Sequence, residues 1–593
     1  MPLIEDRLLR PTKELVELMQ ARARVSVATD THAAKNPNGD RLLFLAFDEA
    51  ANLFKSDGDV RFAALRRVLQ LLNQFPIWSL FLSTKSQIDY LDPREKDDPS
   101  ARIRQHKLSR FSPFIGIELD VEASRRLADP SLCPQELVKP LSDFATADHM
   151  TMFGRPLWLV YARQSYEAIR GMAAYKLLCG RSASEYSPSN RHHVFAAMAA
   201  RLCLDPCMNN EEATALANEA VNSHLRVVVG MDSSSGWITT VTPSEPIVAD
   251  AVAEILSVGG KWPSSVHTLA YDLFSKGLVD KGLKGELFSR LLLVLARDVV
   301  LANNLPQDFR WSQHFPLSKF LETLYASKFI QDLESPRREK RRQSSATTLP
   351  GSFSSAVLNF SHFTSTDQCL KRDTIRDLLH NLMRQQAALQ LCHGQQYWDL
   401  LIPIYFGEPS APFDPSALSA VVVQVKNRHD ATSLKVDGPE YDDFFGISDT
   451  SANPVLCLLL DLESTPTGRE TVKLMRNGTQ SRVFGIHSRG SSSTIFGCLK
   501  RIPGMEDACR ELFRVVGPRE AQEEDICSHN LVFRYHGWRE RFPRMYEAGG
   551  EQQAEALSDE EMECSEGEED GGDLEMGDAD AGERGMGDED HAE

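Results

Sequence analysis

The sequence predicts a multidomain α/β protein with two strand-containing parts, a largely helical middle region and an acidic tail. Apolar runs of strand length occur near the N-terminus, at 42–47 and 77–83, and recur between 397 and 487. The residues from 150 to 330 instead show apolar side chains at helical spacing. Because strands that alternate with helices favour parallel sheets, we expect both strand-containing parts to be α/β. The length of 593 residues suits about three to four domains.

The first strand, 42–47, leads directly into two carboxylates, Asp48 and Glu49. P-loop ATPases carry such a strand, called Walker B, in a buried parallel sheet. Its first carboxylate holds Mg²⁺ and its second polarises the attacking water. The alternative is a strand followed by a helix whose acidic first turn suits the positive end of the helix dipole.

The second strand, 77–83, supports the ATPase-like interpretation. It ends at Ser83 and Thr84, where ATPases of this class place a polar sensor of the γ-phosphate, and a helix-like stretch at 60–74 separates it from the first strand. However, no GxxxxGK[ST] loop occurs anywhere in the chain. Since this loop cradles the phosphates, we expect weak or no ATP binding and no ATP hydrolysis.

The helical middle region contains several amphipathic segments. Helices are predicted over 163–179 and 285–297, and the turn Gly154-Arg155-Pro156 opens the region. A further helix is expected to start near 244, with Ser244 as its N-cap, followed by Glu245 and Pro246.

A second group of chemically suited residues lies in the C-terminal strands. A helix over 373–391 is expected to precede strands at 397–406, 417–428, 453–464 and 482–487. Asp399 opens the first of these strands, and Gln424 and Lys426 lie two apart on the next, so the latter pair shares one face of the sheet.

This D…QxK pattern is typical of restriction-endonuclease-like nucleases. The aspartate and the residue at the Gln424 position bind Mg²⁺, and the lysine assists the attacking water and stabilises the charge on the phosphorane. A glutamine carbonyl can ligate a hard cation but adds no negative charge, so weaker metal binding is expected unless another carboxylate such as Asp461 helps. The alternative is a set of ordinary buried strands in which Lys426 extends from a sheet edge to water.

The net charge of −19 comes almost entirely from the C-terminal tail. Residues 551–593 contain nineteen Asp and Glu residues against one Arg, so the remaining chain carries 64 basic and 65 acidic residues, or −1. The tail has no aromatic residues, cannot bury a core and is expected to be disordered. It is either a solubilising appendage or a segment that binds basic proteins or mimics nucleic acid.

The sequence predicts a nuclear or cytoplasmic protein outside the secretory pathway. It has no apolar run of about eighteen residues and no signal-peptide core, so no membrane partner is expected. Eleven cysteines lie scattered without paired spacing, which favours reduced thiols. The basic run 337–342 is either a nuclear-import or nucleic-acid-binding segment or simply part of an exposed linker.

Taken in order, these segments resemble a family of fungal Crinkler-like proteins, which couple a P-loop ATPase module to a restriction-endonuclease-like nuclease domain. The resemblance runs from about 40 to 500 and implies DNA as a substrate. It implies ATPase residues at Asp48, Glu49 and Thr84, with Gly154 and Pro156 in a turn near the nucleotide, and nuclease residues at Asp399, Gln424 and Lys426. The missing phosphate loop departs from the family pattern. The segments that carry the resemblance are LLFLAFDEA, FPIWSLFLST, HMTMFGRPLW, TPSEPIVADA, KGLKGELFSRLLLVLARD, YWDLLIPIYFG and VVVQVKNR.

The implied organisation has five parts. They are a truncated P-loop NTPase-like domain at 1–150, a helical lid or winged-helix-like region at 151–330, a basic flexible linker at 331–355, a restriction-endonuclease-like domain at 356–545 and a disordered acidic tail at 546–593. The first hypothesis is a Crinkler-like effector or toxin-like protein that cleaves DNA with Mg²⁺ and has an ATPase-like regulatory half. The alternatives are a non-catalytic interaction scaffold with decayed sites, and a true ATPase whose phosphate loop lies upstream of this sequence.

Overall fold

The structure is a computed structural model of the chain. It describes residues 5–18, 43–48, 50, 58–72, 75, 77–82, 119–128, 136, 138–207, 211–232, 237–279, 284–304, 310–334, 349–366, 369–370, 374–392, 398–426, 445, 453–463, 470–476 and 482–515. The predicted disordered tail and the basic run at 337–342 lie outside these residues.

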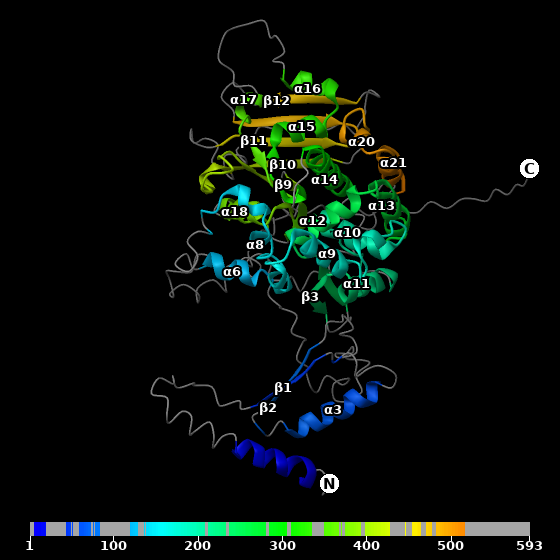
Figure 1. The fold of residues 1–593 in the computed structure, drawn as a ribbon. Helices are drawn as coiled ribbons and strands as arrows, with labels where there is room; N and C mark the ends of the chain where they lie inside the picture. The colour runs from blue at the N-terminus through cyan, green and yellow to red at the C-terminus, as the bar shows by residue number, and fades with distance from the viewer. Residues whose placement is uncertain are drawn as a thin grey trace, which may run out of the picture. The chain divides into compact units, whose positions relative to one another are not determined.

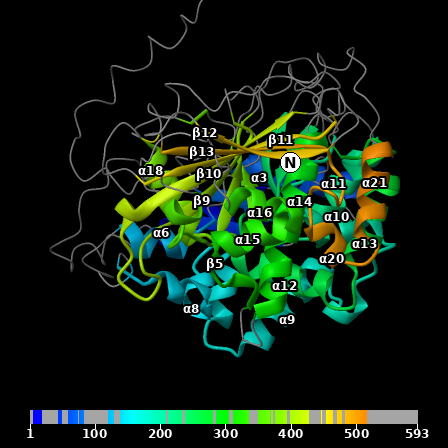
Figure 2. The same ribbon diagram turned by 90° about the horizontal axis from the view of Figure 1, so that it is seen from above.

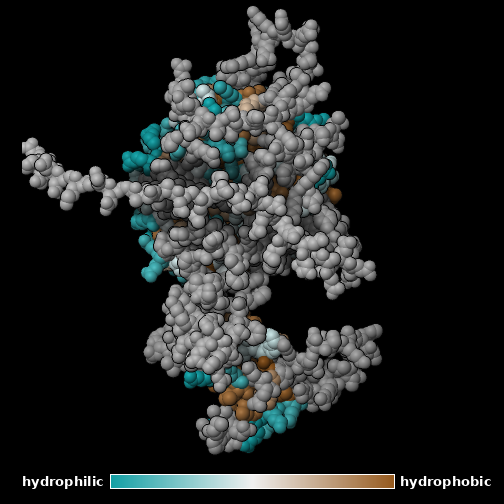
Figure 3. Space-filling model, turned by 180° about the vertical axis from the view of Figure 1, so that it is seen from behind, coloured by the Kyte–Doolittle hydropathy of each residue, from teal (hydrophilic) through white to brown (hydrophobic). Residues whose placement is uncertain are grey.

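The N-terminal piece contains the two predicted strands and the helix between them. Strands β1 (Leu43–Phe47) and β2 (Ile77–Phe81) pair in parallel, with Phe47 opposite Phe81, and helix α3 (Gly58–Leu72) connects them. The prediction of a parallel β–α–β arrangement is therefore confirmed for these elements. Several apolar side chains of this piece are exposed, among them Phe44, Trp78 and Leu80. Figure 3 shows brown, hydrophobic residues at the surface of the N-terminal piece.

A nine-stranded mixed sheet forms the centre of the larger part (Figure 1). Its main path runs β12-β13-β11-β10-β9-β6-β5, and β7 and β8 join beside β9. Neighbours β10, β11 and β13 are parallel, whereas β9 and β12 are antiparallel to their partners. The strands are β5 (Phe315–Pro316), β6 (Val357–Leu358), β7 (His362–Ser365), β8 (Ala387–Gln390), β9 (Leu400–Tyr405), β10 (Leu418–Lys426), β11 (Val455–Asp461), β12 (Thr471–Arg476) and β13 (Val483–Arg489).

One face of this sheet is covered by the helices of the middle region. Val421 and Val423 of β10 point into the same core as Leu292 of α14 (Lys284–Asn304) and Phe320 of α15 (Leu317–Leu324). Figure 2 shows α12, α14 and α15 together on one side of the sheet. Other helices of this layer are α9 (Tyr166–Leu177), α10 (Arg191–Leu202), α12 (Pro246–Ser257), α13 (Trp262–Thr268), α20 (Cys498–Arg501) and α21 (Met505–Val515).

A second hydrophobic core lies on the opposite face of the sheet. Ala420 and Val422 of β10 contact a second core that includes Leu379 and Leu382 of α18 (Ile375–Arg384). Phe144, which belongs to the segment before the helical region, also lies in this core. Because alternate residues of a strand point to opposite faces, the even-numbered residues of β10 face α18 and the odd-numbered ones face the helical layer.

The remaining elements are short, apart from α11. They are η1 (Glu5–Leu9), α6 (Val121–Ala128), η4 (Leu141–Ala145), α8 (Ala147–Met150), η5 (Pro156–Tyr161), η6 (Ala183–Glu185), α11 (Glu211–Ser223), β3 (Val227–Asp232), β4 (Trp237–Val241), η7 (Leu269–Phe274), η8 (Arg310–Ser312), α16 (Ser327–Glu334), α17 (Leu349–Ser352) and η10 (Pro415–Ala417). In the part of the chain that the structure describes, no helix is both long and apolar enough to cross a membrane.

The helical middle region and the C-terminal sheet share one hydrophobic core. This core contains Phe195 and Leu292 from the helical region together with Leu458 and Ile486 from the sheet. Strand β5 lies in the helical part of the sequence, yet it pairs with β6 at the edge of the sheet. Two ends of the predicted linker 331–355 are also structured, since α16 reaches Glu334 and Phe353 is buried. The described residues between 145 and 513 therefore contribute to one continuous core.

Two local predictions were wrong. The helix expected over 373–391 ends at Arg384, and after Gln386, which has a positive φ of 52°, the chain forms strand β8. Its apolar run AALQLC suits either structure, and the positive φ ends the helix without a glycine signal. Ser244 is not the N-cap of α12: that position is Glu245, with Pro246 in the first turn. The Ser244 hydroxyl instead lies 2.8 Å from Nε2 of His362.

Candidate active site at the end of the central strands

The pairing of β9 with β10 places Asp399 beside Gln424. In this antiparallel pair Leu400 lies opposite Val423, and the Asp399 N–H donates to the Val423 carbonyl at 2.9 Å. One step further along each strand, Asp399 and Gln424 are opposite each other. The Asp399 carboxylate continues the ladder, since its Oδ2 accepts from the Val425 N–H at 2.6 Å. The carboxylate is therefore held at the end of β10.

Asp399, Gln424 and Lys426 share one face of the sheet. Gln424 and Lys426 alternate with Val425, which points into the core under the helical layer, so both point to the α18 side. Asp399 is two residues before Leu401, which also packs on the α18 side. All three side chains are half-buried. The structure thus brings the three predicted nuclease residues to one end and one face of the sheet.

Burial and the neighbouring positive charge shift the pKa of Asp399 in opposite directions. Burial raises the pKa of its carboxyl group above the usual value, whereas the Val425 N–H and the positive charge of Lys426 lower it. The net effect is a raised pKa. A proton therefore competes for this carboxylate at a higher pH than it would at an exposed aspartate.

A second row of polar residues continues from Lys426 across the neighbouring strands. Lys426 lies opposite Asp461 of β11, and Asp461 lies opposite Arg489 of β13. The Asp461 side chain is 1% exposed, and its Oδ2 lies 3.3 Å from Nε of Arg489 and 3.9 Å from Nε2 of His487. Burial, together with the charges of Arg489 and Lys473, lowers the pKa of His487 to about 4, so this imidazole is neutral at neutral pH.

Sequence reasoning identified Asp461 only as a possible helper and did not identify Arg489 or His487. Both residues lie on β13, which was expected to end at 487 but continues to Arg489. A signal that could have found them is the alternation along FGIHSR, because it places His487 and Arg489 on the same face as Asp461.

The oxygen atoms at this sheet end suit a hard cation. Asp399 offers a carboxylate and Gln424 a carbonyl, the donor types that Mg²⁺ prefers, and Mg²⁺ usually keeps several waters and needs few protein ligands. Among the residues that the structure describes, no three His, Cys, Asp or Glu side chains form a metal-binding group. A cation here would therefore rely on Asp399, Gln424, water and substrate oxygens. Asp461 faces Arg489 instead.

The N-terminal candidate residues are described only in part. Asp48 directly follows β1 and is exposed, at the same end of the parallel pair as the end of β2. The Leu82 N–H donates to the Phe47 carbonyl at 2.8 Å, which keeps the two strand ends together. Glu49 and Thr84 lie outside the described residues. The ATPase-like assignment of Asp48, Glu49 and Thr84 stays a prediction.

Gly154 lies in a turn that packing explains without a nucleotide. Its φ is +82°, and a Cβ at this position would overlap the buried Glu245 side chain. Glu245 in turn accepts from the Arg155 N–H and from Nε1 of Trp158, each at 2.8 Å. Pro156 begins η5 and is exposed. The nucleotide contact of Gly154 and Pro156 stays a prediction.

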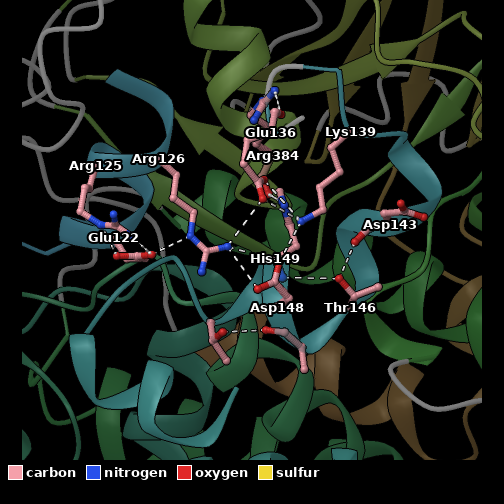
Figure 4. A network of polar contacts seen from close by, with 12 residues as sticks. Glu122, Arg125, Arg126, Glu136, Lys139, Asp143, Thr146, Asp148, His149 and Arg384 are labelled. Carbon is pink, nitrogen blue, oxygen red and sulfur yellow. Dashed lines mark hydrogen bonds and ion pairs between the residues drawn. The ribbon is translucent and has the colours of Figure 1, made fainter. Parts of the chain in front are cut away.

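A separate polar network ties the segment before the helical region to α18 (Figure 4). Arg126 of α6 contacts Glu122 at 2.6 Å and Asp148 at 3.1 Å. Nε2 of the buried His149 lies 2.9 Å from the Arg384 carbonyl, at the end of α18. Burial holds the pKa of His149 well below its usual range, so the ring is neutral. The described residues between 119 and 150, predicted as part of the NTPase-like domain, thus contact α18 through His149 and Glu136.

Another buried histidine, His362, links Ser244 to Ser361. Its Nε2 lies 2.8 Å from the Ser244 Oγ and its Nδ1 lies 2.8 Å from the Ser361 Oγ. This chain resembles a serine–histidine relay, but burial lowers the pKa of His362 to about 3. Because a general base works best with a pKa near the operating pH, this group is better suited to structure than to catalysis.

A protein-family model matches part of the chain. Residues 202–443 match a family described as a domain of unknown function (DUF8736). The matched stretch covers less than half of the chain, from the end of α10 through β10, and it includes Asp399, Gln424 and Lys426. It crosses from the helical region into the sheet, in agreement with their shared core. No curated protein and no solved structure matches the chain.

Proposed function

We propose that this protein is a Crinkler-like effector that cleaves phosphodiester bonds in DNA. In this proposal Asp399 and the Gln424 carbonyl hold Mg²⁺, and Lys426 lies beside the attacking water. The supporting observation is the register of β9 and β10, which sets Asp399 opposite Gln424, with Lys426 two residues further along the same face. The proposal gives the N-terminal β1–α3–β2 piece the role of a degenerate ATPase-like regulatory half.

The residue types fit the roles. When bound, Mg²⁺ supplies an activated water and neutralises charge on the phosphate. Asp399 needs to be deprotonated to hold the ion, and the nearby Lys426 charge favours that form. The Lys426 ammonium also stabilises negative charge that develops on the phosphorane oxygens. Gln424 ligates through a neutral oxygen, so the site is expected to need more Mg²⁺ than one with two carboxylates.

A cleavage assay tests the proposal. Purified full-length protein should convert supercoiled plasmid to nicked circles when Mg²⁺ or Mn²⁺ is present. Lys426→Ala should lower the rate by about 100-fold or more while leaving DNA affinity nearly unchanged, because the lysine acts mainly in the transition state.

Lys500→Ala is the matched control, because Lys500 is exposed on α20 away from the three residues. It should cleave like the wild type. Equal rates for Lys426→Ala and wild type would contradict the proposal, since the activity would then come from another site or from a contaminant.

A further inference from the structure

Arg489 lies in the same row across the sheet as Lys426, on the same face. The pairings Lys426 with Asp461 and Asp461 with Arg489 define this row. With neighbouring strands about 4.8 Å apart, the backbone positions of Lys426 and Arg489 are about 10 Å apart. The next pair in this part of the sheet sets Lys473 of β12 opposite His487. Three basic residues therefore follow the end of the sheet from β10 to β12.

Asp461 orients Arg489 rather than completing the proposed metal site. Its carboxylate is almost fully buried and contacts Nε of the guanidinium at 3.3 Å. A buried carboxylate on one side of an arginine restricts the direction of the guanidinium fork, which is the group that binds phosphate with two parallel hydrogen bonds. The Arg489 side chain keeps 24% of its surface exposed. Solvent, and hence a ligand, can reach it.

The surroundings of Arg489 favour an anionic ligand. Lys473 is exposed on the next strand, and His487 between them is neutral at neutral pH. Lys426 lies on the other side of Asp461. The acidic group of this row, Asp461, is buried, whereas the basic groups are partly or fully exposed.

We propose that Arg489, oriented by Asp461, binds a phosphate neighbouring the one cut beside Lys426, with Lys473 extending the contact along the strand. The substrate class is then a polynucleotide strand with several consecutive phosphates, rather than a mononucleotide or a small phosphodiester. This inference rests on the proposed function, because Lys426 defines the position of the cleaved phosphate.

The test compares two substrates and two readouts in the full-length protein. For Arg489→Ala, the apparent KM for DNA should rise about tenfold, and the slope of log affinity against log salt should fall by about 1, as for the loss of one phosphate contact. Hydrolysis of bis(p-nitrophenyl) phosphate, which has one phosphodiester and no neighbouring phosphate, should stay at the wild-type rate.

Further variants separate the orienting role from simple charge. Arg489→Lys keeps the positive charge but loses the two-pronged guanidinium. Its salt slope should therefore equal that of the wild type, whereas its KM for DNA should lie between those of the wild type and Arg489→Ala. Asp461→Asn should raise KM for DNA like Arg489→Ala and leave the small diester unaffected. Arg510→Ala, at an exposed arginine of α21, is the control and should match the wild type.

The outcomes distinguish this inference from the proposed function. An unchanged salt slope and KM in Arg489→Ala, with cleavage still lost in Lys426→Ala, would overturn the inference alone. A reduced slope in Arg489→Ala, with no metal-dependent cleavage by the wild type, would overturn the nuclease proposal and retain Arg489 as a phosphate contact. Slower hydrolysis of the small diester in Arg489→Ala would place Arg489 at the cleaved phosphate and contradict the assignment.

Discussion

At position 154, the backbone conformation and the neighbouring Glu245 side chain allow only glycine. Its positive φ and its contact with Glu245 leave no room for a side chain. Gly154→Ala should lower the free energy of unfolding by about 2 kcal/mol or more, because it adds both backbone strain and overlap in a buried turn. Chemical denaturation followed by circular dichroism measures this change.

Gly171 of α9 provides the comparison, since nothing lies within 4 Å of a Cβ added there. Gly171→Ala should be neutral or stabilise by about 0.5–1 kcal/mol, as expected for alanine in a helix. Equal stabilities of the two variants would show that the packing at Gly154 does not matter.

Asp250 gives the protein a pH-dependent stability. Its buried carboxyl accepts hydrogen bonds from Tyr166 at 3.0 Å and from Ser312 at 2.9 Å, and burial raises its pKa to about 6. An unfolded aspartate has a pKa of about 3.9. Between these values the folded state binds more protons, so the free energy of unfolding falls as pH rises from about 4 to about 6.

The shift corresponds to a loss on the order of 3 kcal/mol across that range. Asp250→Asn removes the ionisable group and should flatten this part of the stability curve. Denaturant titrations at a series of pH values measure the slope. A wild type and a variant with the same slope between pH 4 and pH 6 would show that Asp250 does not carry the effect.

The residues of the candidate site differ in how well the sequence predicts them. Asp399, Gln424 and Lys426 could be named in advance because two adjacent strands and a two-residue spacing determine which side chains share a face. Arg489 could not be assigned to the site from the sequence, because it lies on β13, a strand that comes much later in the chain than β10. Its partner Asp461 could be recognised only once the order β10-β11-β13 was known.

At the scale of elements, the end of α18 contacts Glu136 and His149 of the segment before the helical region. Arg384 donates from Nε to His380 at 2.8 Å and from Nη2 to the Glu136 carbonyl at 2.7 Å. Arg384→Ala should lower stability by about 2 kcal/mol and expose this segment to protease, since buried hydrogen-bonded groups lose their partner. Limited proteolysis with mass spectrometry locates the cuts.

Arg376 lies on the same helix but is exposed, so Arg376→Ala is the matched control and should resist protease like the wild type. If the protease cuts Arg384→Ala between 119 and 150 no faster than the wild type, contacts other than those of Arg384 protect this segment.

The predicted strands are those with long apolar runs. Strands β9, β10 and β11 are buried on both faces, so their sequences are almost continuously apolar and easy to recognise. Strand β12, TVKLMR, is the edge strand of the sheet beside β13 and mixes polar with apolar residues, so it was not predicted. Strand β8 was assigned to a helix because its apolar residues fit either period.

At the scale of the whole molecule, the helical region and the sheet depend on one another. The helices supply one side of the core on which Val421, Leu458 and Ile486 pack. A fragment of residues 349–515 should therefore be unfolded or aggregate, whereas 119–515 should unfold cooperatively, because burying an apolar side chain contributes about 1.5–3 kcal/mol. Thermal unfolding of both fragments tests this, and a cooperative transition in 349–515 alone would contradict the shared core.

This interdependence could not be predicted from the sequence. The helical pattern of 285–297 shows that one face of the helix is buried, but it does not show against what. Leu292 packs beneath strands more than a hundred residues later in the chain. The resemblance to a two-module family separated these parts at 331–355, whereas the apolar contacts join them.

The most direct test of the central claim is single-turnover DNA cleavage measured against Mg²⁺ concentration for wild type and Gln424→Glu. The second carboxylate adds negative charge at the proposed metal ligand, so cleavage by Gln424→Glu should reach half its maximum at a lower Mg²⁺ concentration than wild type. Identical Mg²⁺ dependence of the two proteins, or no metal-dependent cleavage by folded wild type, would contradict the assignment of Asp399, Gln424 and Lys426 as a nuclease site.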